Sequence, residues 1–463
     1  MGLRGSEARV DAVGGMRVWS IGWAWVVLAA ACGGEIDRDH YIRVDGALRA
    51  GDATRASELV EEAGRRVYGE RNRLLYHMDL GMALQMAGDY AGSAAQFEQA
   101  ESLGEDLYTR SLGNEAASLF TSDNMAPYSG EEFERVLVNV FNAMNFAVQG
   151  ELEEALVEVR RVSAKFEVHA REGQGRYRSD PLALYLSGLL YEQAGELDDA
   201  RIALEKAAAL YEASEGEYFV ALPPMLGKDL ARVREHRPMV GKAGGGEIVV
   251  LHYVGPGPRK QERVFEVSLG HGLVLVQQSQ IRREDEKQVQ RALSAAKGMA
   301  MGTQVTVAYP VFEQPAVAAT RAFLDVEGCG GAWAVPVESV SRIAQVNLED
   351  RMSRVWSRVV GRAVLKFVSA KAAGAVGERL SGQAGVGFLV EAVTRAALSA
   401  VEAADVRGWR TLPAEVHMSR LECPAGQYVV RVSHGGGTGC AGQQFDAVRV
   451  GNGTRTWLVS SCY

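Results

Sequence analysis

A short pattern of small and apolar residues recurs along the first half of the chain, and it limits what that half can fold into. The clearest copy begins at Leu182 and reads LALYLSGLLYEQAGELDDARIALEKAAALY. Gly195 stands in the middle of it, between two stretches whose apolar residues have helical spacing. A second copy has its glycine at Gly88, and fainter copies have theirs at Gly51 and Gly150. Each copy therefore predicts a hairpin of two helices.

This pattern resembles the tetratricopeptide repeat (TPR). A single hairpin cannot bury its apolar face alone, so several hairpins must stack into a solenoid. Glycine suits the turn because it adopts left-handed torsions without strain. We therefore expect residues 36–240 to form a TPR-like helical domain, and a generic helical bundle is the alternative.

In the TPR resemblance, the first helix of each hairpin lines the concave face of the solenoid. The corresponding row in this chain is apolar and rich in methionine, which adapts to varied partners. One interpretation is a groove for a peptide or helix of a protein partner. The other is a surface covered by the chain's own C-terminal domain, and the sequence leaves both open. The candidate groove residues are Met78, Met82, Gln85, Val140, Met144, Tyr185, Leu189 and Glu192.

The N-terminal segment has the features of a bacterial export signal. Arg17 precedes an apolar run from Val18 to Leu28, and three alanines then lead to Cys32. A signal peptidase accepts only small residues near the bond that it cuts. The segment resembles a lipobox, with Leu28 one place further from the cysteine than in the commonest pattern. We expect residues 1–32 to be a signal peptide with a lipid on Cys32. A cleaved secretory peptide without lipid, or an ordinary buried helix, are the alternatives.

Glycine rather than aspartate follows Cys32. Aspartate at that place retains lipoproteins at the inner membrane of enteric bacteria, so the resemblance implies an outer-membrane lipoprotein that faces the periplasm. After residue 32 no run is long and apolar enough to cross a bilayer. The best candidate, residues 384–403, contains Glu391, Arg395 and Glu402, which predicts a buried or amphipathic helix instead.

Four cysteines remain besides Cys32, and an even set in an exported protein suggests disulfides. If Asn452-Gly453 closes a two-residue hairpin turn, the flanking strands bring Cys462 near Cys440. We therefore predict a disulfide between Cys440 and Cys462. A bond between Cys423 and Cys440 is the competing pairing, and free buried thiols are the other possibility.

The second half of the chain has the alternation typical of strands. Pro238 and the run from Gly244 to Gly246 end the helical pattern, and segments such as EIVVLHYV and QYVVRVSH follow. Between them, about residues 339–405 look helical. The fold class is thus α+β: a TPR-like α-solenoid followed by a β-rich, sandwich-like domain over residues 247–463 with an inserted helical hairpin.

Several segments resemble a family of uncharacterised bacterial TPR-containing outer-membrane lipoproteins. They read NMAPYSGEEFERVLVNVFNAMNFAVQGELEEALVEVRRV, GEIVVLHYVGPGPRK, VGRAVLKFVSAK and RGWRTLPAEVHMSRL. The resemblance spans most of the chain after residue 32. It implies the architecture and the location given above, and it implies no activity.

No recognisable catalytic motif accompanies these features. The eight histidines are scattered singly, and neither a nucleophile elbow nor a Walker A loop is present. The run from His434 to Gly437 is similar to an oxyanion loop, but we interpret it as a strand connection. Ser294 and Lys297 lie one helical turn apart without the companion motifs of penicillin-interacting enzymes.

These observations favour a scaffold over an enzyme. The net charge of -8 offers no basic surface for nucleic acid, and we expect no metal and no cofactor. The favoured function is a lipid-anchored TPR scaffold that binds a protein partner of the cell envelope. The alternative is an envelope hydrolase or transferase with an unrecognised site in the C-terminal domain, which a deep pocket with convergent polar groups would favour.

Overall fold

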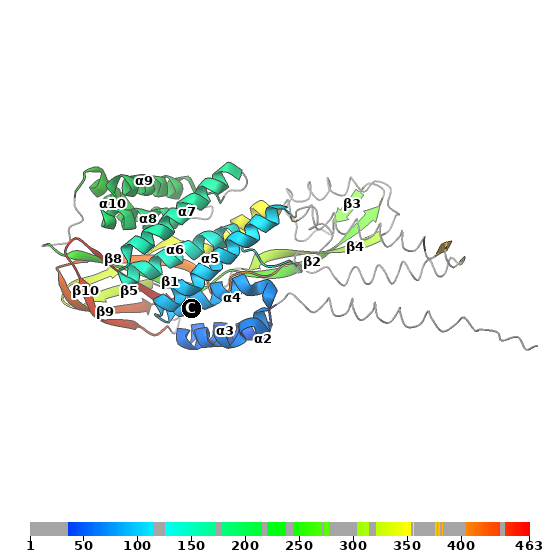
Figure 1. Ribbon diagram of the computed structural model, residues 1–463, viewed down its shortest axis with the longest axis horizontal. Coiled ribbons are helices and arrows are strands. Elements are labelled where there is room, and N and C mark those ends of the chain that lie inside the picture. The colour runs from blue at the N-terminus through cyan, green and yellow to red at the C-terminus, as the bar shows by residue number, and fades with distance from the viewer. Residues whose placement is uncertain are drawn as a thin grey trace, which may run out of the picture.

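Nine helices of the described residues come first along the chain and the strands follow, with a further helix at residues 340–352 between two of the strands, and this makes the fold α+β (Figure 1). The computed structural model describes residues 36–113, 126–172, 177–214, 220–237, 244–270, 273–276, 303–313, 321–352, 404–435 and 440–463, with a few single positions between 355 and 382. The predicted signal peptide with Cys32 lies outside the described residues, and so do Ser294 and Lys297. In the described part of the chain, no helix has the length and apolarity needed to span a bilayer.

The helices form a layer in which neighbours in sequence are also neighbours in space. A short 3-10 turn, η1 (Glu70–Asn72), precedes the third of them. Their bounds are α2 (Arg38–Arg49), α3 (Ala53–Tyr68), α4 (Arg73–Met86), α5 (Tyr90–Gly113), α6 (Glu132–Gln149), α7 (Leu152–Glu172), α8 (Pro181–Ala194), α9 (Leu197–Ser214) and α10 (Pro224–Arg234).

The glycines that mark the sequence repeats stand at the turns between paired helices. Gly51, Gly88, Gly150 and Gly195 have φ values of 76°, 84°, 80° and 83°. This is the left-handed region, which glycine adopts most readily. The predicted helical hairpins are therefore present as α2–α3, α4–α5, α6–α7 and α8–α9.

A second glycine in two of the hairpins lets the paired helices cross closely. A Cβ on Gly81 of α4 would lie 2.7 Å from the ring of Phe97 on α5. A Cβ on Gly188 of α8 would lie 2.6 Å from Leu204 on α9. Both pairs are separated by the same number of residues, so the repeat places the same contact in each hairpin.

The strands of the described residues form two four-stranded sheets and a three-stranded arm. The first sheet has the order β11-β1-β8-β7, and its strands are β1 (Gly246–Pro256), β7 (Val335–Glu338), β8 (Pro413–Cys423) and β11 (Arg455–Cys462). The second has the order β10-β9-β5-β6, and its strands are β5 (Arg321–Val326), β6 (Gly330–Trp333), β9 (Gly426–Gly435) and β10 (Gln443–Val450).

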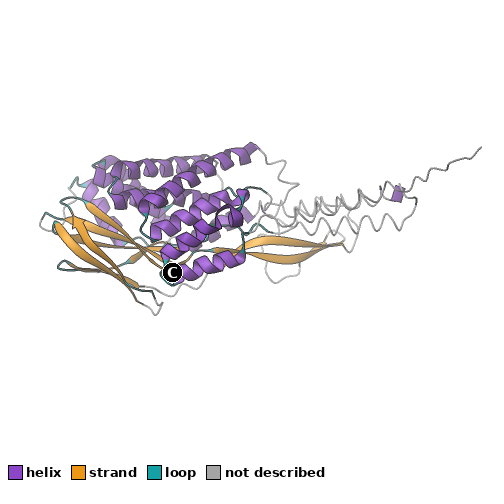
Figure 2. Cartoon of the chain, turned by 60° about the horizontal axis from the view of Figure 1, so that its bottom comes forward, coloured by secondary structure: helices purple, strands orange, loops and turns teal. Residues whose placement is uncertain are grey.

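The arm is made by β2 (Arg259–Gly270), β3 (Leu273–Val276) and β4 (Thr303–Glu313). The pair β2–β4 extends from the helical body in the direction opposite to strands β5, β9 and β10 (Figures 1 and 2). At its base, buried Lys260 forms an ion pair with Glu131, and Arg259 pairs with Asp45 of α2 at 2.6 Å. The first described helix therefore lies beside the base of the arm.

The first sheet is the middle layer of the molecule, and both of its faces are buried. On β1, Val249, Leu251 and Tyr253 belong to the apolar core that the sheet shares with the helices. The alternate residues Ile248 and Val250 belong to a second core, between the two sheets. This explains why β1 is apolar at nearly every position, because a strand covered on both faces has no solvent side.

The predicted hairpin at Asn452-Gly453 is wrong. β10 and β11 flank this turn but lie in different sheets, and β11 pairs in parallel with β1. A turn signal is local and does not determine which strands become neighbours. In the predicted helical insert, residues 340–352 are helical, and most of the remainder up to residue 403 lies outside the described residues.

Candidate functional site

The predicted groove residues lie where the sequence placed them, on the first helix of successive hairpins. α4 has Met78, Met82 and Gln85, and α6 and α8 have the other five. The structure brings all eight into one row, and every one of them is buried. The first sheet covers this row. The interpretation as an open groove for a separate partner does not hold, because the chain's own C-terminal half occupies the space.

Aromatic side chains make much of this contact. Tyr253 of β1 donates a hydrogen bond from its hydroxyl to Gln85 Oε1 over 2.8 Å, and its ring packs edge-on against Phe141 of α6 with centroids 5.3 Å apart. Trp409, just before β8, contacts Phe97 and Phe141 with centroid distances of 5.8 and 5.9 Å. Edge-to-face pairs of this kind add to the free energy of apolar burial.

A buried ionic network joins the helices to the sheet. Arg455 of β11 has a fully buried side chain that pairs with Glu192 of α8 and, at 2.9 Å, with Glu247 of β1. Arg455 also donates to the Leu189 carbonyl oxygen over 2.7 Å. Arg232 of α10 binds the other Glu192 oxygen at 2.7 Å. Breaking such a buried pair leaves an uncompensated charge, which is strongly destabilising.

A second arginine extends the network along the sheet. Arg420 of β8 pairs with Glu247 at 2.7 Å and with Asp229 of α10, and it donates to the Tyr185 hydroxyl over 2.8 Å. Burial opposes ionisation of Asp229 and Glu192, yet the arginines outweigh it and hold the pKa of both carboxyl groups below the usual range. Two of the candidate groove residues, Tyr185 and Glu192, therefore bind the sheet and are not free for a partner.

Further buried carboxyl groups lie at the same contact. Asp79 of α4 accepts hydrogen bonds from the hydroxyls of Tyr41 and Tyr68, at 3.1 and 2.9 Å, and from the Thr411 hydroxyl at 3.0 Å. Burial raises the pKa of Asp79 to about 6 in spite of these donors. At the start of α8, burial also raises the pKa of Asp180, which contacts Glu338 at the end of β7.

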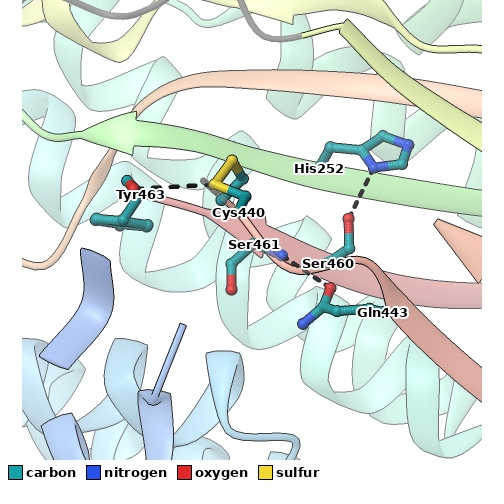
Figure 3. Close-up of a disulfide and its surroundings, with 7 residues drawn as sticks. His252, Cys440, Gln443, Ser460, Ser461 and Tyr463 are labelled. Carbon is teal, nitrogen blue, oxygen red and sulfur yellow. Dashed lines mark hydrogen bonds between the residues drawn. A yellow bond between two sulfur atoms is a disulfide. The ribbon is translucent and has the colours of Figure 1, made fainter. Parts of the chain in front are cut away.

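The four cysteines among the described residues form two disulfides. Cys440 is bonded to Cys462, with Cα atoms 5.5 Å apart, which is the pairing expected from the sequence (Figure 3). Cys329 is bonded to Cys423, with Cα atoms 5.7 Å apart, so the competing Cys423–Cys440 pairing is not formed. The route to the prediction was wrong, because the strands beside Cys440 and Cys462 do not form a hairpin with each other.

His252 and Ser460 lie near the Cys440–Cys462 disulfide (Figure 3). His252 Nδ1 is 2.7 Å from Ser460 Oγ, and its Nε2 is 2.8 Å from Ser419 Oγ. A serine beside an imidazole is the start of a nucleophilic site, but all three side chains are buried between the sheets. Burial lowers the pKa of His252 to about 3, which makes the imidazole a weak base. The contact therefore has a structural role.

The most exposed large apolar side chain of the described residues lies elsewhere. Trp333 of β6 is 60% exposed, and its ring lies 4.8 Å from that of Phe323 on β5. We call residues 321–333 the edge hairpin, because β6 forms an edge of the second sheet. The disulfide at Cys329, in the turn of this hairpin, fixes it to β8. This surface was not predicted from the sequence. The signal was a tryptophan two residues after Gly330-Gly331, in a run without charged residues.

Within the described ranges, no group of three or more His, Cys, Asp or Glu side chains is placed to hold a metal ion. Comparison with protein-family models, with curated protein sequences and with solved structures found no match.

Proposed function

We propose that this chain is an outer-membrane lipoprotein, held by a lipid on Cys32 and facing the periplasm, that acts as a protein–protein interaction scaffold. In this proposal residues 36–240 are a TPR-like solenoid, and residues 247–463 are a sandwich-like β domain. The partner is a protein of the cell envelope.

The helical hairpins support the TPR-like assignment. The turn glycines Gly88 and Gly195 have the same left-handed conformation, and Gly81 and Gly188 make the same close crossing with the second helix. The first sheet of the same chain packs against the concave face of the solenoid. A partner must therefore bind on the outside of the molecule.

Trp333 is the single observation that carries the scaffold role. Tryptophan is enriched among the residues that dominate protein interfaces, and a rigid support lowers the entropy cost of binding. The disulfide between Cys329 and Cys423 provides such a support for the edge hairpin. The two disulfides also support export, because disulfides persist in oxidising compartments.

The lipid anchor is tested by Cys32→Ser. We expect the unaltered chain to incorporate labelled palmitate and to partition into the detergent phase. Cys32→Ser removes the thiol that is acylated, so the variant should lose both properties. Palmitate incorporation at the level of the unaltered chain in Cys32→Ser would exclude the anchor.

The binding surface is tested by Trp333→p-benzoylphenylalanine, which cross-links on irradiation to whatever lies against the edge hairpin. We expect a protein adduct in the intact envelope. The control carries the same photoreactive residue at Val157, which is also exposed but lies on the outer helix α7. Absence of an adduct at position 333, or equal adducts at both positions, would contradict the proposed surface.

A further inference from the structure

We infer that α2 contacts the membrane directly: a stripe of exposed residues along this helix lies against the anionic phospholipid headgroups of the bilayer that holds Cys32. The stripe consists of Arg38, Ile42, Gly46 and Arg49, and we call it the α2 stripe. The inference rests on the proposed lipid anchor and deepens it, because it gives the molecule one orientation on the membrane instead of a free tether.

The chain leaves little distance between the lipid and α2. Residues 33–35 separate Cys32 from Ile36, whose side chain is already buried in the apolar core that includes α2. An extended chain spans at most about 3.6 Å per residue, so the Cα of Cys32 lies within about 14 Å of the Cα of Ile36. A bilayer that holds Cys32 therefore lies beside this end of the helical layer.

Helical spacing places the four residues of the α2 stripe on one side of the helix. At 3.6 residues per turn they lie within a sector of about 80°. All four are exposed, whereas the opposite side of α2 is buried in the core. Ile42 is 57% exposed, more than any other large apolar side chain on the described helices. At Gly46, no atom lies within 4 Å of where a Cβ would be, so the middle of the stripe is open.

The charges of the α2 stripe suit an anionic surface. Arg38 and Arg49 are its charged members, and neither forms a hydrogen bond or an ion pair with the described part of the chain. Asp45 lies one turn before Arg49, but its carboxylate already pairs with Arg259 at 2.6 Å. Both guanidinium groups are therefore available to phosphate groups.

Two acidic residues at the start of α2 lie beside the stripe and not on it. Asp37 caps the N-terminus of the helix, where it accepts a hydrogen bond from the Asp39 N–H over 3.0 Å. Asp39 lies one turn before Arg43 on the next row of the helix, so these two charges offset each other. The stripe itself has positive charge and no negative charge.

Exposed apolar residues on two other helices have acidic surroundings instead. Val157 on α7 is 45% exposed and lies one turn after Glu153, and Ile202 on α9 is 42% exposed and lies one turn after Asp198. The corresponding place before Ile42 is taken by an arginine. A carboxylate there would be repelled by anionic headgroups, so α2 suits the membrane better than α7 or α9 does.

An apolar side chain between arginines is typical of a helix that lies in the membrane interface. The isoleucine enters the headgroup region, the arginine stems extend along it, and the guanidinium groups bind phosphate oxygens. Such a contact is weak alone, but the lipid on Cys32 would hold the stripe close to the bilayer and so raise its effective concentration. The contact therefore determines orientation rather than attachment.

The test places a fluorophore on the stripe of the full-length, lipidated chain. Ile42→Cys is labelled with bimane and reconstituted in vesicles of phosphatidylethanolamine and phosphatidylglycerol, of which a fraction has a nitroxide in the headgroup that quenches bimane at short range. The matched control is Ile202→Cys on α9, at the other end of the helical layer (Figure 1). We expect several-fold stronger quenching at position 42 than at position 202.

The charges are tested in the chain labelled at position 42. Arg38→Gln combined with Arg49→Gln should lower the quenching several-fold, and so should high salt, because salt screens exposed charges. Arg160→Gln combined with Arg171→Gln is the matched control. It removes two exposed arginines from α7 and should leave the quenching unchanged.

Flotation of the vesicles separates the two claims. Equal quenching at positions 42 and 202, or none at either, in a chain that floats with the vesicles would overturn the α2 contact and leave the lipid anchor intact. A stripe that binds a protein instead gives this result, because the vesicles contain no other protein. Quenching that is unchanged after loss of both arginines would also overturn the headgroup contact. A chain that does not float overturns the anchor and the contact together.

Discussion

At the scale of single residues, the contact between the helices and the first sheet is polar as well as apolar. Arg420 and Arg455 reach from the sheet to carboxylates on α8 and α10, and Asp79 reaches from α4 to Thr411. The sequence did not predict these pairs, because charged residues on a helix usually face solvent. Glu192 was predicted to line the row, but its partner Arg455 is 263 residues away along the chain.

Asp79 provides a test at this scale. Its pKa is raised by burial from 3.8 to about 6, so the folded state holds the proton more tightly than the unfolded chain does. This contribution to stability is complete below about pH 4 and is lost as the pH rises through 6. The shift corresponds to a fall of about 3 kcal/mol in the free energy of unfolding.

Asp79→Asn cannot ionise and should lack this part of the pH dependence, although it will be less stable overall because two tyrosine hydroxyls lose an acceptor. Urea unfolding followed by circular dichroism between pH 4 and 7 measures the free energy of unfolding of the unaltered chain and of Asp79→Asn. We expect the free energy of unfolding to fall more steeply with rising pH in the unaltered chain than in Asp79→Asn. Parallel curves would show that Asp79 titrates normally.

At the scale of elements, the sequence predicted what depends on local spacing. The four helical hairpins and strands such as β1 and β9 follow from periodicity and from turn glycines, which are properties of a few consecutive residues. It did not predict which strands are neighbours. β11 joins β1 in parallel although 208 residues separate His252 from Ser460, and no local signal encodes such a pairing.

The helix crossings provide a test at this scale. Gly188→Ala would place a Cβ 2.6 Å from Leu204, so we expect a loss of about 1–3 kcal/mol in the free energy of unfolding. The matched control is Gly46→Ala in α2, where nothing lies within 4 Å. There alanine should raise stability by about 0.5–1 kcal/mol, because it favours the helix more than glycine does. Equal effects in urea unfolding would contradict the close crossing.

At the scale of the whole molecule, the helical half and the β-rich half pack together as one body. One apolar core includes Met78 and Met144 from the helices together with Val249 and Trp457 from the sheet. The sequence identified the row on the helices but not what covers it, because an apolar surface has the same composition whether its occupant is a partner or the same chain. The substitutions Met144→Asp and Tyr185→Asp would therefore report on folding rather than on partner binding.

Oxidation of the methionines in the predicted groove tests whether the first sheet covers the helices. Hydrogen peroxide oxidises methionines that solvent reaches, and mass spectrometry of the unaltered chain measures each rate. Met78, Met82 and Met144 are fully buried under the first sheet, as is Met418 within it, whereas Met225 on α10 is only partly buried. We expect all four buried methionines to oxidise far more slowly than Met225 until the chain unfolds globally. Oxidation of Met78, Met82 and Met144 at the rate of Met225, with Met418 still protected, would show an open groove and contradict it.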